Sequence, residues 1–365
     1  MFEVKNIEDT DLVKNPVIAQ MSKHNHEQLL FCNDSETGLK AIIAVHSTVL
    51  GPALGGTRMW TYNNEMEALN DVLRLSRGMT YKNSISGLNL GGGKAVIIGD
   101  SRSMKSEALF RRFGKFVNSL AGKYITAEDV GISPTDMTWV NMETDHVVGL
   151  PGKSGDPSPV TAHGTYMGMK ACAKAQFGSD SLSGKKVAVQ GVGHVGGYLV
   201  DFLTKEGAEV FISDIHEPTL KSISEKFGAK VVGLDEIYDL DMDIYAPCAL
   251  GATINDDTIS RLKCSIIAGA ANNQLKLEDV HGKAVMDKGM IYAPDFTLNA
   301  GGVINCYAEV KGLSPEWAMS KADEIYTTIL NIVNRSHSEG TPTYQIANKM
   351  AEERIESIGK VKLPL

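Results

Sequence analysis

A glycine-rich turn, Gly191-x-Gly193-x-x-Gly196, joins the apolar run 187–190 to the helical pattern 198–205. A strand that leads into such a turn and then into a helix is typical of a dinucleotide-binding domain. The first glycine permits a tight turn, the second lets the backbone approach a pyrophosphate, and the third lets helix and strand pack closely. The sequence therefore predicts a doubly wound, Rossmann-type α/β domain with phosphate at the helix N-terminus.

An acidic residue, Asp214, ends a second apolar run, about 20 residues beyond the glycines. A carboxylate there can accept hydrogen bonds from ribose hydroxyls, and its charge repels a 2′-phosphate, which favours NAD over NADP. The alternative is that the glycines only form a turn and Asp214 only caps a helix. Because strand, glycines, helix and acid coincide, we expect an NAD site formed by Gly191, Gly193, His194, Val195, Gly196 and Asp214.

Apolar runs alternate with amphipathic patterns along most of the chain, which predicts α/β layers. In the first third, helices are expected at 65–77 and 109–120, and strands at 41–45, 95–98 and 124–126. Beyond the turn-forming stretch 149–159, a helix capped by Thr161 is expected to reach Gln176. Further strands are expected at 187–190, 210–213, 244–246, 265–268 and 291–293, and helices over 315–360 with a break at 340–342.

The length of 365 residues exceeds the usual size of one hydrophobic core, so two domains are expected. We place their connection in the stretch 149–159. A cleft between two domains is the usual place for a ligand.

The formal net charge of −8 argues against general affinity for nucleic acid or an anionic membrane, because both need a positive field. A small-molecule substrate is expected instead.

Residues 1–14 lack the pattern of a secretory signal, and no stretch is long enough to span a bilayer. The five scattered cysteines fit neither a disulfide framework nor a zinc site, and His24 and His26 are interpreted as solvated. We therefore expect a cytoplasmic protein without a metal.

Two glycine-rich segments in the first third, 51–58 and 77–95, break both helix and strand rules. Their glycines indicate a backbone that comes close to something small, and Lys82 and Lys94 lie within weakly charged surroundings. One lysine can bind a substrate carboxylate, and the other can act as a base if burial and its cationic neighbour lower its pKa. That requires a depression of roughly three units from about 10.4, or about 4 kcal/mol. The spacing of Lys82 and Lys94 alone is equally consistent with two solvated surface lysines.

An acid beyond the strand at 124–126 is a third candidate, since ligands gather at the carboxyl ends of strands in open α/β sheets. Asp129 is the expected residue, although Glu128 beside it could instead be the one that faces the ligand.

Five motifs of the chain resemble the family of leucine, phenylalanine, valine and glutamate dehydrogenases, and within it the leucine dehydrogenases most closely. The resemblance extends over nearly the whole chain. Its motifs are Gly-Pro-Ala-Leu-Gly-Gly-Thr-Arg-Met-Trp at 51–60, Leu-Ser-Arg-Gly-Met-Thr-Tyr-Lys at 75–82, Gly-Gly-Gly-Lys at 91–94, Ile-Thr-Ala-Glu-Asp-Val-Gly at 125–131 and Gly-Ala-Ala-Asn-Asn-Gln at 269–274.

This resemblance implies a role for each matching residue. Lys82 would bind the substrate carboxylate, Lys94 would be the general base that activates water, and Asp129 would exchange protons with the amino group. Other residues would surround the substrate or approach the cofactor. They are Gly55 and Gly56 against the substrate, Met79 and Val303 in the side-chain pocket, Asn272 and Asn273 near substrate and nicotinamide, and Thr161 and Ala249 to Ala252 near the cofactor.

The implied reaction is the reversible NAD-dependent oxidative deamination of L-leucine and other branched-chain L-amino acids to 2-oxo acids and ammonia. Hydride transfer gives an iminium, and water activated by Lys94 attacks it. A valine or phenylalanine dehydrogenase is the nearest alternative, because a methylene or so in a pocket discriminates by only about 1–3 kcal/mol. A catalytically silent NAD-binding protein is the alternative from another class.

The resemblance also implies domain roles and an assembly. Residues 1–148 would form the substrate-binding and oligomerisation domain, joined by C-terminal helices within 332–365, and residues 149–331 would form the NAD-binding domain. Domain closure would exclude water, and the implied assembly is a homo-octamer.

Overall fold

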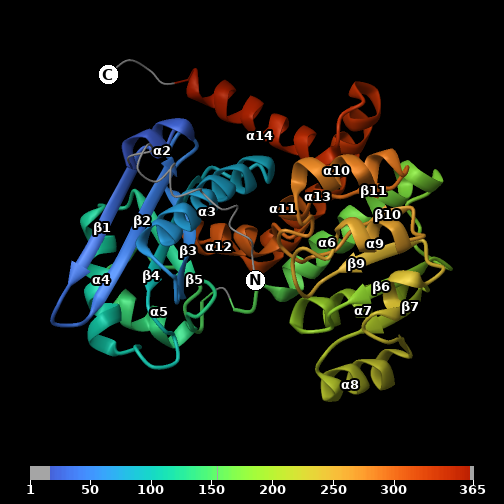
Figure 1. Cartoon of the computed structure of the whole chain (residues 1–365), viewed down its shortest axis with the longest axis horizontal. Helices are drawn as coiled ribbons and strands as arrows, with labels where there is room; N and C mark the ends of the chain where they lie inside the picture. Colours follow the sequence, from blue (N-terminus) through green and yellow to red (C-terminus); the bar gives the residue numbers. More distant parts are fainter. Residues whose placement is uncertain (1–16, 154, 362–365) are drawn as a thin grey trace. The chain divides into compact units, whose positions relative to one another are not determined.

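The structure is a computed structural model that describes residues 17–153 and 155–361. The prediction on residues 1–14 therefore falls outside the described residues. The chain divides into two compact units (Figure 1). The first unit lies within 1–155, 309–312 and 351–365, and the second lies within 156–308 and 313–350.

The first unit contains a five-stranded sheet with the order β1-β2-β4-β3-β5. Strand β2 is antiparallel to β1 and β4, whereas β3 is parallel to β4 and β5. The strands are β1 (Gln28–Asp34), β2 (Leu39–Ser47), β3 (Ala53–Trp60), β4 (Gly91–Ile98) and β5 (Tyr124–Glu128). The helices are α2 (Val17–Lys23), α3 (Glu65–Ile85), α4 (Glu107–Ser119) and α5 (Pro134–Asn141).

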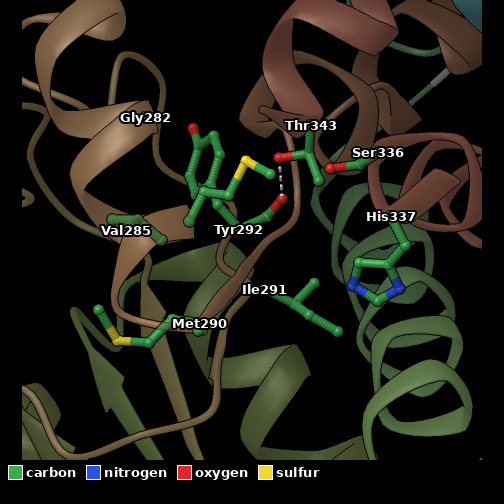
Figure 2. Close-up of a pocket in the computed structure, with 10 residues that line it drawn as sticks. Gly282, Val285, Met290, Ile291, Tyr292, Ser336, His337 and Thr343 are labelled. Atoms are coloured by element: carbon green, nitrogen blue, oxygen red, sulfur yellow. Dashed lines mark hydrogen bonds between the residues drawn. The ribbon is translucent and has the colours of Figure 1, made fainter. Parts of the chain in front are cut away.

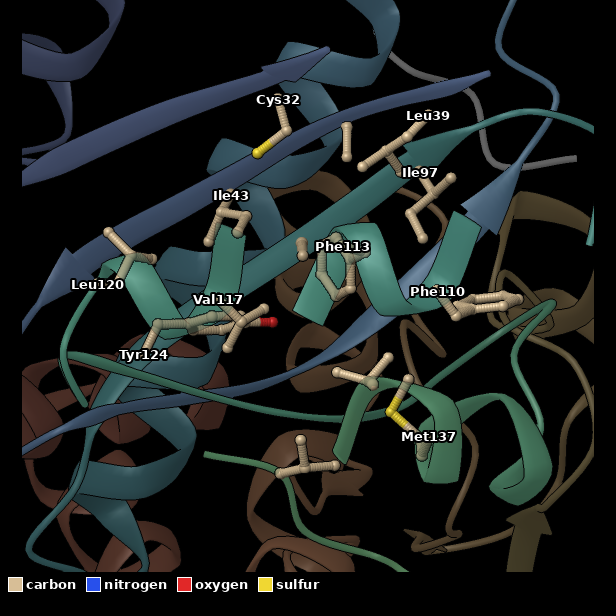
Figure 3. Packing of buried hydrophobic residues seen from close by; sticks show 14 of the residues in the cluster. Cys32, Leu39, Ile43, Ile97, Phe110, Phe113, Val117, Leu120, Tyr124 and Met137 are labelled. Carbon is tan, nitrogen blue, oxygen red and sulfur yellow. The ribbon is translucent and has the colours of Figure 1, made fainter. Parts of the chain in front are cut away.

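Strand β2 is buried on both faces, which explains its nearly continuous apolar sequence. Ile43 packs into a core cluster with Phe110 and Phe113 of α4 (Figure 3). Its neighbour Ile42 belongs to a second cluster with Leu69 of α3. Since successive strand side chains point to opposite faces, α3 and α4 cover opposite sides of this sheet.

The two glycine-rich segments are regular elements, which corrects the expectation that they break helix and strand rules. Strand β3 covers most of the first segment, and the second comprises the end of α3, a short turn over 86–90 and the start of β4. The physical reason is close packing within the protein. A Cβ atom on Gly91 would lie 1.9 Å from the Ser47 carbonyl oxygen, and one on Gly92 would lie 2.1 Å from the Thr80 nitrogen.

A pair of alanine substitutions tests this packing. Gly92→Ala is expected to destabilise the protein by about 1–3 kcal/mol, because the added methyl group pushes α3 away from β4. Gly78→Ala, on the same helix but with open space around the glycine, is expected to stabilise it by about 0.5–1 kcal/mol. Denaturant unfolding measures both changes, and shifts of the same sign would contradict the packing argument.

The second unit contains a six-stranded, entirely parallel sheet with the order β11-β10-β9-β6-β7-β8. Numbered along the chain and taken from β8, this is the 3-2-1-4-5-6 order of a dinucleotide-binding fold. The strands are β6 (Lys186–Gln190), β7 (Glu209–Ser213), β8 (Lys230–Val231), β9 (Ile244–Pro247), β10 (Ile266–Ile267) and β11 (Ile291–Tyr292). The predicted Rossmann-type fold is confirmed.

Helices alternate with these strands, and two long helices end the chain (Figure 1). They are α6 (Ser158–Phe177), α7 (His194–Glu206), α8 (Glu217–Phe227), α9 (Asp256–Arg261), α10 (Glu278–Asp287), α11 (Asp295–Leu298), α12 (Gly301–Lys311), α13 (Pro315–Glu339) and α14 (Thr343–Gly359), with a 3₁₀ turn, η1 (Glu236–Asp239). The predicted break between the last two helices is confirmed, and Gly340 there adopts a φ of 62°. None of the helices in the described part has the length and apolarity that crossing a membrane requires.

Two expectations at domain boundaries differ from the structure. Thr161 lies within α6, whose N-cap is Pro157, and its hydroxyl donates to the Pro157 carbonyl oxygen at 3.0 Å. The helix therefore begins before the residue expected to cap it. Of the C-terminal stretch expected to join the first domain, only residues from 351 onward fall in the first unit, while 332–350 fall in the second. The functional roles of the two domains stay predictions.

Candidate active site

An ion pair between a buried lysine and a partly exposed carboxylate joins two predicted catalytic residues in the first unit. Lys94 lies within β4 and is 6% exposed, and its Nζ atom is 2.8 Å from Oδ2 of Asp129. Asp129 directly follows β5. A carboxylate just beyond the carboxyl end of a strand lies where open α/β sheets bind ligands. The interpretation of Lys94 as a solvated surface residue is therefore wrong.

The surroundings of this pair shift the pKa of both members. Burial lowers the pKa of Lys94 below its usual value, although the charge of Asp129 opposes the shift and Arg58 adds to it. Burial alone would raise the pKa of Asp129, but the charges of Lys94 and Arg58 lower it to about 2. The neutral lysine is thus more accessible than in water, and the carboxylate stays ionised.

The sequence predicted Lys82 as the cationic neighbour that lowers the pKa of Lys94. In the structure, Arg58 is a cation that lowers this pKa. Sequence reasoning missed this arginine. Its Nε atom lies 3.1 Å from Oδ2 of Asp129, and its NH1 atom lies 2.9 Å from Oδ2 of Asp71. Asp71 also accepts a hydrogen bond of 2.8 Å from the Tyr62 hydroxyl. Helical periodicity gave no signal for Arg58, because its partner Asp71 lies on the polar side of the predicted helix 65–77.

The predicted substrate residues of the first unit lie on β3 and α3. Met79 and Lys82 are both half-buried and share one face of α3, since residues three apart on a helix are neighbours. Met79 contacts the Gly55 position, where an added Cβ would lie 3.2 Å from the Met79 Cγ atom. A Cβ on Gly56 would lie 3.0 Å from the Cβ of Asp129. The nearest atoms to the two missing Cβ positions are the carbonyl oxygens of Gly93 and Glu128, at 1.8 and 2.4 Å, so both glycines permit close packing within the protein.

The glycine turn of the second unit has three different environments. Gly191 adopts a φ of 96°, and an added Cβ would lie 2.6 Å from that of Ala249. A Cβ on Gly196 would lie 2.0 Å from the Gly191 carbonyl oxygen, so this glycine permits close packing of turn and helix. Gly193 is exposed and has no atom within 4 Å of its missing Cβ among the described residues. As it precedes α7 without a side-chain cap, helix N–H groups remain for a phosphate.

Asp214 stabilises the same turn. Its carboxylate accepts hydrogen bonds from the backbone nitrogens of Val192 at 2.7 Å and of His216 at 2.8 Å. The N-cap of α8 is His216, so the alternative that Asp214 only caps a helix does not describe its contacts. One oxygen accepts each of these bonds, and an ionised carboxylate has about four acceptor positions, which leaves capacity for ribose hydroxyls. The turn and Asp214 together fit a dinucleotide.

The remaining predicted residues also lie in the second unit. Asn273 and Ala252 both adopt positive φ, 51° and 60°, and the Ala252 nitrogen donates to the Asn273 carbonyl oxygen at 2.7 Å. Such backbone angles are uncommon outside glycine and cluster at ligand sites. Asn272 accepts a hydrogen bond of 2.6 Å from Asn299, and Val303 is buried in α12.

A small cavity in the second unit lies apart from the predicted site residues. Its volume of about 190 Å³ is smaller than most ligand pockets. Figure 2 shows its lining, which includes Met290, Ile291 and His337 but none of the predicted site residues. The Thr343 hydroxyl there already donates to the Tyr292 carbonyl oxygen at 2.6 Å.

One of the two histidines interpreted as solvated is buried. His24 is exposed, as expected, but His26 is only 7% exposed, and its ring centroid lies 4.7 Å from that of His46. Within 17–153 and 155–361, no group of three or more His, Cys, Asp or Glu side chains is arranged to hold a metal ion.

A glycine turn of the dinucleotide-binding type with an acid on the next strand, together with a lysine–carboxylate pair in the other unit, fits a nicotinamide-dependent dehydrogenase. Comparison with known proteins identifies the family. The model of the Glu/Leu/Phe/Val dehydrogenase dimerisation domain matches residues 26–146, and that of Glutamate/Leucine/Phenylalanine/Valine dehydrogenase matches residues 212–361.

Individual relatives match nearly the whole chain. The leucine dehydrogenase of Bacillus subtilis is 57% identical over 92% of this chain and 93% of that protein. The phenylalanine dehydrogenase of Lysinibacillus sphaericus is 47% identical over 96% and 94%, respectively. The crystal structure of L-tryptophan dehydrogenase from Nostoc punctiforme has a TM-score of 0.86, with 44% identity over 94% of this chain and 99% of that chain. This chain belongs to the Glu/Leu/Phe/Val dehydrogenase family and is an NAD(P)-dependent amino-acid dehydrogenase.

Proposed function

We propose that this enzyme catalyses the reversible, NAD-dependent oxidative deamination of L-leucine and other branched-chain L-amino acids, giving 2-oxo acids and ammonia. The observation that carries the chemistry is the ion pair of the buried Lys94 with Asp129. The choice of an aliphatic substrate is supported by relatives named leucine dehydrogenase that are 53–57% identical over more than nine-tenths of the chain.

Each proposed catalytic residue has a task that its surroundings favour. Lys94, when neutral, accepts a proton from the water that attacks the substrate, and its lowered pKa makes this form accessible. Asp129 exchanges protons with the substrate nitrogen, and Lys82 binds the substrate carboxylate as a fixed cation. The bound nicotinamide supplies the hydride acceptor.

A half-buried Met79 and a buried Val303 are the proposed lining of the side-chain pocket. Both are aliphatic, which favours leucine, isoleucine and valine. Gly55 and Gly56 would lie against the substrate, and Asn273 would lie near it.

Steady-state NADH formation with leucine, isoleucine, valine, phenylalanine and tryptophan tests the substrate. Leucine or another branched-chain amino acid is expected to give the highest kcat/KM. The aromatic substrates are included because relatives named phenylalanine and tryptophan dehydrogenase are 46–47% identical. A preference for either aromatic amino acid would overturn the assignment.

The cofactor preference depends on Asp214 in this proposal. Gly191, Gly193, His194, Val195 and Gly196 would hold the pyrophosphate, with Thr161, Ala249 and Asn272 near the rest of the cofactor. Asp214→Ser is expected to lower the ratio of kcat/KM for NAD over NADP by about tenfold or more, because it removes both the ribose acceptor and the charge that repels a 2′-phosphate. Initial rates with each cofactor measure the ratio.

The control for this substitution is Glu217→Gln, which removes a nearby acid at the start of α8. That variant is expected to keep the wild-type ratio. An unchanged ratio in Asp214→Ser would contradict the proposed role.

We also propose a homo-octamer in the cytoplasm. The family model that matches residues 26–146 is described as a dimerisation domain, and light scattering would count the chains of 39.4 kDa. All five cysteines are free, as is usual for proteins of a reducing compartment.

A further inference from the structure

We propose that Arg58, held in place by Asp71, is a positioning residue that fixes the ionised carboxylate of Asp129 at the reaction centre. This inference rests on the proposed function, which gives Asp129 a part in the reaction. It adds a residue that binds neither substrate nor cofactor in that proposal.

The geometry of Arg58 is that of a bridge between two carboxylates. Its Nε atom contacts Asp129 at 3.1 Å, while NH1 contacts Asp71 at 2.9 Å, and its side chain is 17% exposed. A guanidinium presents donors in a rigid planar fork and can serve two acceptors at once. A lysine ammonium cannot hold the same orientation, because it is a point charge on a flexible stem.

The local strand geometry explains why the arginine reaches this place. Gly56 and Arg58 are two residues apart on β3, so their side-chain positions face the same side of the sheet. A Cβ on Gly56 would lie 2.4 Å from the Glu128 carbonyl oxygen and 3.0 Å from the Asp129 Cβ, so the glycine lets residues 128 and 129 come close to β3. Arg58 then contacts the Asp129 carboxylate from the next position on that side.

Asp71 orients the arginine from α3. Its Oδ2 atom accepts from both Arg58 and the Tyr62 hydroxyl, at 2.9 and 2.8 Å, and its Oδ1 atom accepts from Arg74 at 3.0 Å. Asp71 is 7% exposed. Moving the Arg58 guanidinium away would leave the buried Asp71 carboxylate without this partner, which costs free energy. The contact with Asp71 therefore keeps the guanidinium in one orientation.

The contacts on Asp129 hold its carboxylate in the ionised form. The closest contacts of Lys94 and Arg58 are both to Oδ2, at 2.8 and 3.1 Å, and the Val130 backbone also hydrogen-bonds to this carboxylate. The titratable groups around this carboxylate are Lys94, Arg58, Asp71, Tyr62, Tyr124 and Glu128.

The test compares Arg58→Gln, Arg58→Lys and Arg102→Gln by the pH dependence of kcat/KM for amino-acid oxidation. Loss of the Arg58 charge favours the protonated forms of both Lys94 and Asp129, so the apparent pKa values of the pair are expected to rise by about one unit in Arg58→Gln. Misplacement of Asp129 is expected to lower kcat by about 10–100-fold, with a much smaller change in KM.

The other two variants separate charge from orientation. Arg58→Lys is expected to restore most of the wild-type pH profile but not kcat, because it returns the charge without the bridge. Arg102→Gln is the control, since Arg102 is an exposed arginine of the same unit that takes no part in the ion pairs joining Arg58, Asp71 and Asp129. It is expected to keep the wild-type profile.

Thermal unfolding of each variant distinguishes positioning from a merely structural role. If Arg58→Gln lowers only the melting temperature and leaves the pH profile and kcat unchanged, the inference is wrong. The profile is measured with whichever amino acid the wild-type enzyme oxidises, so a failed substrate assignment leaves this test intact.

Discussion

Replacing Lys94 with alanine is expected to lower kcat for amino-acid oxidation by about 10²–10⁴-fold, the usual contribution of one general base. The side chain is almost fully buried, and burial lowers its pKa, which is the arrangement that a lysine base needs near neutral pH. NAD binding is expected to be retained, because the glycine turn lies in the second unit. Turnover is measured by NADH absorbance and cofactor binding by calorimetry.

The matched control is Lys115→Ala, which removes an exposed lysine of the same unit. Lys115 has 61% of its side chain exposed and lies 3.9 Å from Glu143, so its removal is expected to be nearly silent. Lys94→Ala also removes one of the cations that contact Asp129. Thermal unfolding measures the resulting loss of stability separately from the loss of turnover. Wild-type turnover in folded Lys94→Ala would refute the assignment of the base and would favour a silent cofactor-binding protein.

The sequence predicted the second unit better than the first for a physical reason. The turn from β6 to α7 requires glycines at fixed spacing, so the motif specifies strand, turn, helix and ligand together. Glycines in β3 and β4 instead serve close contacts between distant segments, such as Gly92 against Thr80 of α3. The local sequence does not distinguish a glycine needed for close packing within the protein from a glycine needed for contact with a ligand. The sequence therefore predicted irregular backbone where β3, α3 and β4 are regular.

The candidate site shows the same limit. Lys94 and Asp129 could be named from the sequence, but their 2.8 Å contact depends on β4 and β5 each pairing with β3. Arg58 stayed unrecognised because its two partners are 13 and 71 residues away along the chain. Periodicity places residues on faces of elements, whereas an ion pair between elements depends on the tertiary fold.

The buried histidine pair should make the first unit sensitive to acid. The Nε2 atom of His26 lies 3.0 Å from the Leu73 carbonyl oxygen, and Nδ1 of His46 lies 2.7 Å from the Thr80 hydroxyl. Both contacts attach the pair to α3, which carries the proposed carboxylate-binding Lys82. Burial is the largest cause that lowers the pKa of His26 to about 4 and that of His46 to about 3.

The sign of the effect follows from which state binds more protons. Between pH 6.5 and about 3 the unfolded chain binds protons that the folded histidines exclude, so stability falls as the pH falls through this range. At about 1.4 kcal/mol per pKa unit, the two rings together should cost on the order of 3–5 kcal/mol between pH 7.5 and 4.5. Full stability is retained above pH 6.5.

Urea unfolding followed by tryptophan fluorescence measures this dependence, because Trp60 and Trp139 lie in the first unit. His46→Gln is expected to lower stability at pH 7.5 through its lost contacts but to flatten the decline towards pH 4.5, since one excluded proton is gone. His216→Gln, at the exposed start of α8 in the second unit, is the matched control and should keep the wild-type slope. Parallel pH dependence in wild type and His46→Gln would show that other groups cause the acid sensitivity.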